Sequence, residues 1–484
     1  MRRNPLMLPR GLLGRGGPKS MRYPVINYLR GLAASSLPMA GLIGVCLSPA
    51  SAQTLPEALA GAYATNPTLR AARAELRAVN EGVPQALANW RPDLTLTGSA
   101  GKQRIDSQTR TTSTDENTTP LEATARLIQP LYRGGRTIAA TARAEHEVRS
   151  QRSTLHSVEQ LVLQSAVAAY MDVWRDHAEI EFNKNNERVI ARQLEAAQDR
   201  FTVGEVTRTD VAQSETRLAV ATADRIAAEG ALKSSRAVYA EIIGGQAGVL
   251  QAPGQAAGLP ANLKAVIELS LSQNPNILAA SFAERAAQRR VREVFGELLP
   301  SVQLNASVSH SEETNSRSVE SDRAQILAEV TIPLYQQGAV SSRVREAKQT
   351  ANQRRIEVEE SRRRTEQEAI SAWEGLQTAR AQIRSFEFGV RSAEIALEGV
   401  RQENAVGART ILDILDAEQE LLDAQVDLVR AERDETVAEH LVLGAIGRLT
   451  ARDLELPVDV YDPEQDYKRV RGSWFGLGAP GVVE

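Results

Sequence analysis

An internal duplication constrains the fold of this chain more than any other feature. The segment Leu55–Gly101 matches Leu263–Ser309, and both carry an Asn-Pro pair, at Asn66-Pro67 and at Asn274-Pro275. The match continues at a constant offset through two glycine turns, apart from one difference in length. A sequence that repeats a long pattern is expected to fold as two structurally similar units.

The duplication and the composition predict five segments. They are a signal peptide at 1–52, a first repeat at 53–244, a Gly/Ala/Pro/Gln-rich linker at 245–261, a second repeat at 262–450 and an irregular C-terminal tail at 451–484.

The N-terminal region has the features of a secretory signal. Several arginines precede an apolar run that ends in Ala50-Ser51-Ala52, an A-x-A cleavage pattern. Translation from Met1 or from Met21 fits this pattern. The only cysteine, Cys46, lies inside it, so we expect an exported chain without disulfides. No later apolar run is long enough for a transmembrane helix.

Each repeat is predicted to contain the same elements in the same order. A helix of about 35 residues ends before Pro92 or Pro300, because proline disrupts a helix. Two alternating strands follow, joined by a polar loop at 102–122 in the first repeat and at 310–323 in the second. A long helix then spans roughly 137–200 or 340–402, on the order of 100 Å, and a shorter helix returns after a glycine.

The long helices are too polar to form a thick globular core, and only 4% of the residues are aromatic. Leu415, Leu422, Val429, Thr436 and Leu443 recur every seven residues, which is typical of coiled-coil packing. We therefore expect a mostly α protein, with some β structure, whose helices pack side by side along their length.

The strands have the period-two pattern of strands in outer-membrane barrels, in which lipid-facing and lumen-facing residues alternate. Val302, Leu304, Ala306 and Val308 alternate with polar residues in the second repeat. A small sheet packed on helices remains the other interpretation. Since the smallest barrels use about eight strands, four strands in a bilayer would have to be shared between several copies of the chain.

Several features together resemble the TolC family of outer-membrane efflux and secretion channels. They are the element order, the Asn-Pro pairs, the PLY-x-x-G pattern after the second strand and VGARTILDILDAEQEL at the second turn. The resemblance covers about Leu55–Thr450. It implies a homotrimer with a twelve-stranded barrel in the outer-membrane lipid of a Gram-negative bacterium. It also implies an α-helical barrel across the periplasm that binds an adaptor protein and an inner-membrane ABC or proton-driven pump.

The two glycine turns are the candidate functional site. Gly204 and Gly407 suit helix C-caps, and Thr207-x-x-Asp210 and Thr410-x-x-Asp413 fit the capping box.

Capping does not explain Asp416, which lies one turn beyond Asp413 where like charges repel. The first repeat has Gln213 there. Three copies would bring six such carboxylates together, and by resemblance Asp413 and Asp416 match the family's cation-attracting aperture.

By resemblance, Arg409, Thr209 and Asp210 match positions that hold the turns of neighbouring helices together. Asn404 stands where the best-known member of the family has tyrosine in this lock. An amide can form hydrogen bonds but lacks the reach of a phenol, so the lock is expected to differ here.

Other classes of function have little support. The net charge of −4 gives no indication of nucleic-acid binding. The five histidines are scattered without metal-ligand spacing, and no catalytic motif is present, so we expect no cofactor, no metal and no enzymatic activity. The alternative is a periplasmic adaptor built on helical hairpins, but an adaptor usually has one hairpin per chain.

Overall fold

The computed structural model describes residues 53–478 except 112 and 315. The predicted signal peptide and residues 479–484 lie outside the described residues. No helix in the described part of the chain has an apolar stretch of the length needed to cross a bilayer.

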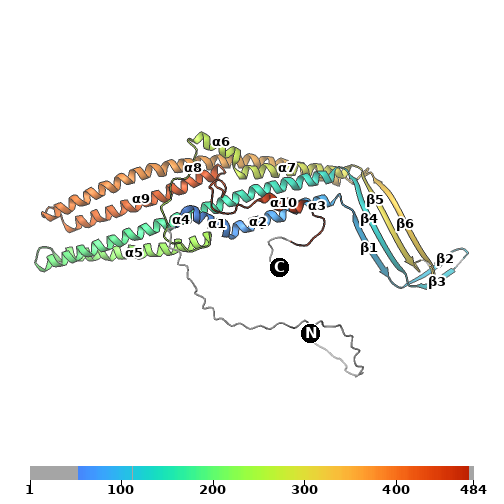
Figure 1. The fold of residues 1–484 in the computed structure, drawn as a ribbon, viewed down its shortest axis with the longest axis horizontal. Helices are drawn as coiled ribbons and strands as arrows, with labels where there is room; N and C mark the ends of the chain where they lie inside the picture. The colour runs from blue at the N-terminus through green and yellow to red at the C-terminus, as the bar shows by residue number, and fades with distance from the viewer. Residues whose placement is uncertain (1–52, 112, 315, 479–484) are drawn as a thin grey trace, which may run out of the picture. The chain divides into compact units, whose positions relative to one another are not determined.

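The two repeats share the predicted order of helices, two long strands, a long helix and a returning helix, and the first repeat also has α3 and the strands β2 and β3 (Figure 1). The first contains α1 (Leu55–Thr65), α2 (Pro67–Asn80), α3 (Gly82–Ala88), β1 (Asp93–Ala100), β2 (Gln103–Gln108), β3 (Ser113–Thr118), β4 (Leu121–Arg133), α4 (Arg136–Thr202) and α5 (Arg208–Ile243). The second contains α6 (Leu263–Gln273), α7 (Pro275–Phe295), the 3-10 turn η1 (Gly296–Leu298), β5 (Ser301–Glu312), β6 (Glu320–Thr331), α8 (Ala339–Ala405) and α9 (Ile411–Ala445).

The first helix of each repeat is not continuous, which corrects the prediction of a single helix of about 35 residues. One break falls at the Asn-Pro pair of each repeat, and in the first repeat a second break at Glu81 separates α2 from α3. Asn66 has ψ 124°, outside the helical region, and its side chain accepts a hydrogen bond from the Thr68 amide at 2.9 Å. Proline at the next position suits the first turn of a new helix. These pairs therefore start α2 and α7.

The same asparagines also attach the broken helices to the returning helices. Asn66 Nδ2 donates to the Ile242 carbonyl at 3.0 Å, and Asn274 Nδ2 donates to the Ala445 carbonyl at 3.1 Å. Those carbonyls belong to the last turns of α5 and α9, where no helical partner remains. Each Asn-Pro break therefore attaches the start of the repeat to the end of its returning helix.

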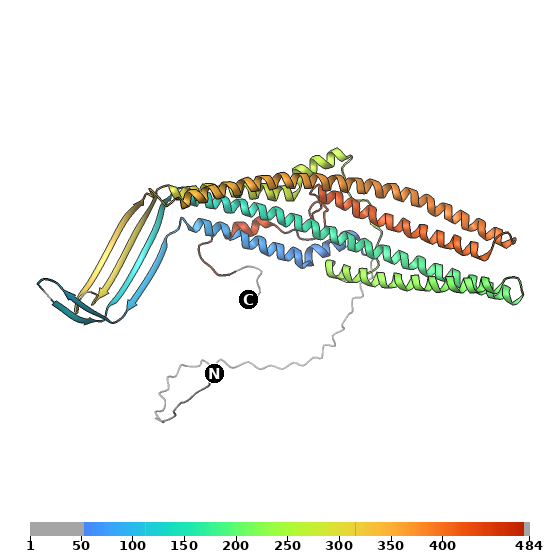
Figure 2. The ribbon, with the colours of Figure 1, turned by 180° about the vertical axis from the view of Figure 1, so that it is seen from behind.

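The four long strands form one antiparallel sheet in the order β1-β4-β5-β6 (Figure 2). Its register places apolar residues opposite one another across all four strands, as in the row Leu94, Leu127, Ala306, Ile326. The neighbouring row, on the other face, is Thr95, Arg126, Ser307 and Gln325. The sheet therefore has one face that is apolar in its central rows and one mainly polar face, and β1 and β6 are its edges.

The loops between the strands are more ordered than predicted. Within the expected polar loop at 102–122, β2 and β3 pair as a hairpin, and Arg104 contacts Asp115 at 2.7 Å. In the second repeat, β5 and β6 extend to Glu312 and Glu320, so the loop is shorter than 310–323. Polar side chains concealed these strands because a hairpin exposed on both faces needs no apolar alternation.

The long helices confirm the prediction closely, since α4 and α8 each contain 67 residues. Helix α4 packs against α5, α7 and α9, whereas α8 packs against α9 and α7. The contacts of α4 with α7 and α9 join the two repeats, and Figure 1 shows these helices running side by side.

The linker and the tail contribute to the core. The buried Tyr170 hydroxyl of α4 donates to the carbonyls of Gln53 and Gln251, at 2.8 and 2.7 Å. The tail was predicted to be irregular, but Ala451 and Leu456 are buried and residues Pro463–Arg471 form helix α10. Asp462 caps this helix and Pro463 begins it, a local signal that the composition-based prediction missed.

Candidate functional site at the helical turns

Two tight turns connect the long helices to the returning helices. Gly204 and Gly407 have φ of 81° and 80°, the left-handed region that favours glycine. In each turn the next amide reaches back to a helix carbonyl: Glu205 N donates to Arg200 O, and Ala408 N donates to Glu403 O, both at 2.9 Å. The glycines therefore end α4 and α8 as predicted.

Both returning helices begin with a capping box, also as predicted. Thr207 N donates to Asp210 Oδ2 at 2.8 Å, and Asp210 N donates to Thr207 Oγ1 at 3.3 Å. Thr410 and Asp413 repeat this arrangement at the same distances. Hydrogen bonds from the backbone and hydroxyl of Thr410 lower the pKa of Asp413 below its ordinary value. Asp210 and Asp413 are thus structural caps in addition to any other role.

Asp416 has a partner that the sequence interpretation missed. Arg217 of α5 donates from its guanidinium to Asp416 Oδ1 of α9, so the ion pair joins the first repeat to the second. Half of the Asp416 side chain, 55%, stays exposed. The carboxylate that looked unbalanced next to Asp413 is therefore compensated by a charge from the other turn.

A comparison of the two repeats could have indicated this pair. At the constant offset, Asp416 corresponds to Gln213, and Arg217 corresponds to Glu420. The repeats therefore differ in charge at two positions one helical turn apart.

Arg409 and Asn404 lie together in the second turn. Arg409 Nε donates to Glu403 Oε2 at 2.8 Å, and Asn404 Nδ2 donates to the Arg409 carbonyl at 2.8 Å. Within the described part of this single chain, no hydrogen bond or ion pair connects either residue with Thr209 or Asp210. The structure thus brings together two of the four predicted lock residues, and it brings the other two together in the first turn.

The two hairpins share an apolar cluster behind the turns. Ile190 and Ala197 of α4, Ala221 of α5, and Ile411 and Leu415 of α9 are buried against one another. Because this cluster draws on both repeats, it joins the two hairpins behind the turns.

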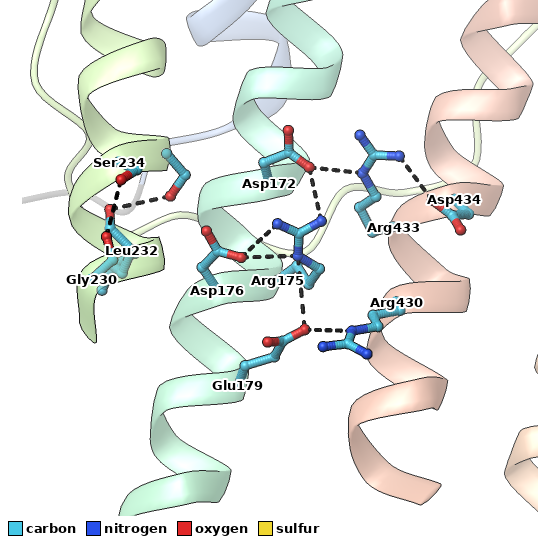
Figure 3. A network of polar contacts seen from close by, with 11 residues as sticks. Asp172, Arg175, Asp176, Glu179, Gly230, Leu232, Ser234, Arg430, Arg433 and Asp434 are labelled. Atoms are coloured by element: carbon cyan, nitrogen blue, oxygen red, sulfur yellow. Dashed lines mark hydrogen bonds and ion pairs between the residues drawn. The ribbon is translucent and has the colours of Figure 1, made fainter. Parts of the chain in front are cut away.

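Further along, a network of ion pairs fastens α4 to α9 (Figure 3). Arg433 Nε contacts Asp172 Oδ1 at 2.9 Å, and Arg430 Nε contacts Glu179 Oε1 at 2.8 Å. Arg175, on α4 itself, contacts the buried carboxylate of Asp176 at 2.6 Å. The linear sequence could not indicate this network, since it depends on which helices become neighbours.

Strand pairing brings together three possible metal ligands that the spacing of the histidines in the sequence does not indicate. The histidines are scattered in sequence, but strand pairing places His310 opposite Asp322 and Glu312 opposite Glu320. One ligand atom from each of His310, Glu312 and Glu320 lies within 4.8 Å of the others. His310 is half-buried and the two glutamates are exposed, and all three belong to the β5–β6 hairpin and not to the helical turns.

The sequence of this chain matches a protein-family model and several known proteins. The family model described as "Outer membrane efflux protein" matches residues 58–245 and 266–448. The chain is 36% identical over 461 residues to the outer membrane efflux protein BepC of Brucella suis biovar 1, covering 95% of this chain and 99% of that protein. It is 26% identical over 421 residues to the outer membrane protein TolC of Vibrio cholerae serotype O1, covering 85% and 94%.

A solved structure has the same fold. The Campylobacter jejuni CmeC outer membrane channel superposes with a TM-score of 0.75 at 15% identity, over 86% of this chain and 89% of that one. The family match spans both repeats, as the duplication requires, and the similarity to BepC covers nearly the whole chain. The chain therefore belongs to the outer membrane efflux protein family.

Proposed function

We propose that three copies of this chain form one continuous duct for the export of small molecules or proteins. The sheets of the three copies would close into a twelve-stranded barrel in the outer membrane, and the long helices would form a tunnel through the periplasm. The observation that carries this proposal is the four-stranded sheet, which has apolar rows on one face and whose edge strands β1 and β6 pair with no further strand in the described residues.

The edges supply the physical reason for an oligomer. Backbone amides and carbonyls at an open edge cannot be left unpaired in hydrocarbon. Four strands are too few to close on themselves, since small barrels use about eight. If β1 of one copy pairs with β6 of the next, every edge is satisfied, with row Leu94–Ile326 facing lipid and row Thr95–Gln325 facing the lumen.

The turns would then form the periplasmic mouth of the duct. Three copies of Asp413 and Asp416 around an axis create a negatively charged constriction that attracts cations. Arg217 offsets part of this charge in each copy. Because the partners of Arg409 and Asn404 lie in their own turn, their contacts with Thr209 and Asp210 would form between neighbouring subunits and hold the mouth closed.

The same turns are the proposed binding site for a partner protein. The surfaces around Gly204, Gly407, Thr207 and Thr410 would bind a periplasmic adaptor, and the adaptor would connect the duct to an inner-membrane ABC or proton-driven pump. The alternative that this chain is itself the adaptor loses its support, because the matched family is one of outer-membrane proteins. That family contains channel proteins and not enzymes.

Planar-bilayer recording tests the constriction. Replacing both Asp413 and Asp416 by alanine should weaken cation selectivity and block by multivalent cations. Asp427→Ala is the control, because it removes an exposed carboxylate from the same helix, α9, outside the turns. Unchanged selectivity in the double variant, or an equal loss in Asp427→Ala, would contradict the constriction.

The lock is tested by charge reversal. Arg409→Glu should raise conductance, because it replaces the proposed attraction to Asp210 of the neighbouring subunit with repulsion. Arg208→Glu makes the same change of charge at the first turn and serves as the control. Equal conductance in Arg409→Glu and the wild type would contradict a role in closure.

A further inference from the structure

The stretch of the tail that follows α10 exposes a group of large apolar side chains. In the segment Ser473–Gly478, the exposed fractions of Trp474 and Phe475 are 58% and 91%, and Leu477 is fully exposed. Exposed apolar groups of this kind are common on surfaces that meet a protein partner or a membrane.

Contacts with the first repeat fix where this segment lies. The guanidinium carbon of Arg91 lies 4.7 Å from the ring centroid of Trp474, within the range of a cation–π interaction. Arg91 precedes the first residue of β1 by two positions, and the carbonyl of its neighbour Trp90 accepts a hydrogen bond from Gln129 of β4 at 2.9 Å. Trp474 is thus held beside the end of the sheet that adjoins the helices.

Helix α10 anchors the segment from the other side. It packs on α2 and α3, and Arg471 forms an ion pair with Glu145 of α4 at 3.0 Å. Arg152 of α4 contacts Glu464 at 3.3 Å. The apolar side chains therefore extend from a helix that is attached at both ends, so their position is defined by the fold.

The same end of the sheet carries further exposed aromatic residues. Trp90 precedes β1, Tyr132 lies near the end of β4, and Tyr335 follows β6, and all three are exposed. Tryptophan and tyrosine concentrate where a membrane protein crosses from hydrocarbon to headgroups. Trp474 and Phe475 continue this set on a segment that is not part of the sheet.

We propose that the segment Ser473–Gly478 is an interfacial anchor that inserts Trp474, Phe475 and Leu477 into the periplasmic leaflet of the outer membrane. The occupant of this surface is phospholipid at the level of the headgroups and upper acyl chains. Contact with Arg91 places the segment at the membrane boundary that the start of β1 defines. The inference rests on the proposed function, because it requires the strands to lie in the bilayer.

Tryptophan fluorescence tests the anchor. The chain has four tryptophans, at 90, 174, 373 and 474, and replacement of the first three by phenylalanine leaves Trp474 as the only reporter. The protein is reconstituted in vesicles of phosphatidylcholine brominated either near the headgroup or near the end of the acyl chains. We expect Trp474 to lose fluorescence in both lipids, and more strongly with bromine near the headgroup.

Two controls separate this proposal from the duct itself. A protein that retains only Trp373, which packs partly buried against the helical core, should keep its fluorescence. In a tryptophan-free protein, Leu96→Trp places a reporter on the apolar face of β1 and should be quenched. If Leu96→Trp is quenched and Trp474 is not, the anchor is wrong and the duct stands. If Leu96→Trp is not quenched, the proposed barrel is wrong.

Two further results also decide the matter. A blue-shifted Trp474 emission without quenching would mean that the segment packs against another subunit, which overturns the anchor. If the multiply substituted proteins do not fold, the difference in quenching between the wild type and Trp474→Phe replaces them. A difference supports the anchor, and none contradicts it.

Discussion

Arg217 of α5 and Asp416 of α9 form an ion pair between the two repeats, just behind the turns. Both side chains are more than a third exposed, so the pair is expected to add at most about 1 kcal/mol to stability. Its larger consequence is electrostatic, because it determines how much of the Asp416 charge remains free at the proposed mouth.

Removal of Arg217 and removal of Asp416 should therefore shift ion selectivity in opposite directions. Arg217→Ala leaves Asp416 uncompensated and should strengthen cation selectivity, whereas Asp416→Ala should weaken it. The measurement is the reversal potential across a planar bilayer under a salt gradient. Arg225→Ala is the control, since Arg225 pairs with Glu187 and Glu229 inside the first repeat. A shift in the same direction for both variants would contradict the constriction.

The asparagines that break the first helices should matter through their amide donors. Asn66→Asp and Asn274→Asp keep an N-cap acceptor but lose the bond to the Ile242 or Ala445 carbonyl. We expect each to lower the free energy of unfolding by about 1–3 kcal/mol, since a half-buried carbonyl loses its donor and faces a carboxylate instead. Thermal or denaturant unfolding in detergent measures this.

Asn262 provides the matched control for that change. It is exposed and caps α6 through Oδ1, which accepts from the Ala265 amide at 2.9 Å. Asn262→Asp should therefore leave stability nearly unchanged. A loss as large as in Asn66→Asp would show that the added charge, and not the lost donor, is responsible.

Buried His440 should make stability fall in acid. Burial lowers the pKa of His440 below its ordinary value of 6.5, an effect that outweighs the Thr436 carbonyl and Glu439. The unfolded chain therefore binds a proton at His440 more readily than the folded chain does. Above the unfolded-state pKa of about 6.5 the histidine is neutral in both states, and as pH falls below about 6.5 the free energy of unfolding decreases. His440→Gln should reduce the drop in melting temperature between pH ~7.5 and ~5. His177→Gln, exposed on α4, is the control, and an equal drop in wild type and His440→Gln would contradict the prediction.

Local patterns predicted the parts of the structure that local interactions determine. The period-two alternation in 301–308, the glycine stops at 204 and 407, and the two capping boxes depend on residues a few positions apart. These features appear in the structure where the sequence indicates them. The duplication added the order of the elements, because two copies must satisfy the same constraints.

Interactions between segments that are distant in sequence cannot be predicted from such local patterns. The partners of Asp416 and Asp172, namely Arg217 and Arg433, depend on how α4, α5 and α9 pack. The β2–β3 hairpin and helix α10 were missed for another reason, since polar segments give no apolar period. The Asn-Pro pairs are a local signal for a helix start, which the prediction of one continuous helix overlooks.

A disulfide between the edge strands tests the shared barrel most directly. Neighbouring strands lie about 4.8 Å apart, so β1 and β6 of one chain are roughly 14 Å apart across β4 and β5, too far for a disulfide. The only cysteine, Cys46, lies in the predicted signal peptide. Leu96→Cys is combined in turn with Ala324→Cys, Ile326→Cys or Ala328→Cys on the same face, and with Gln325→Cys on the opposite face as the control.

We expect at least one same-face pair, oxidised in the outer membrane, to give a covalent trimer on a non-reducing gel, and Leu96→Cys with Gln325→Cys to give none. Monomeric chains for every pair would contradict the closure of one barrel by three copies.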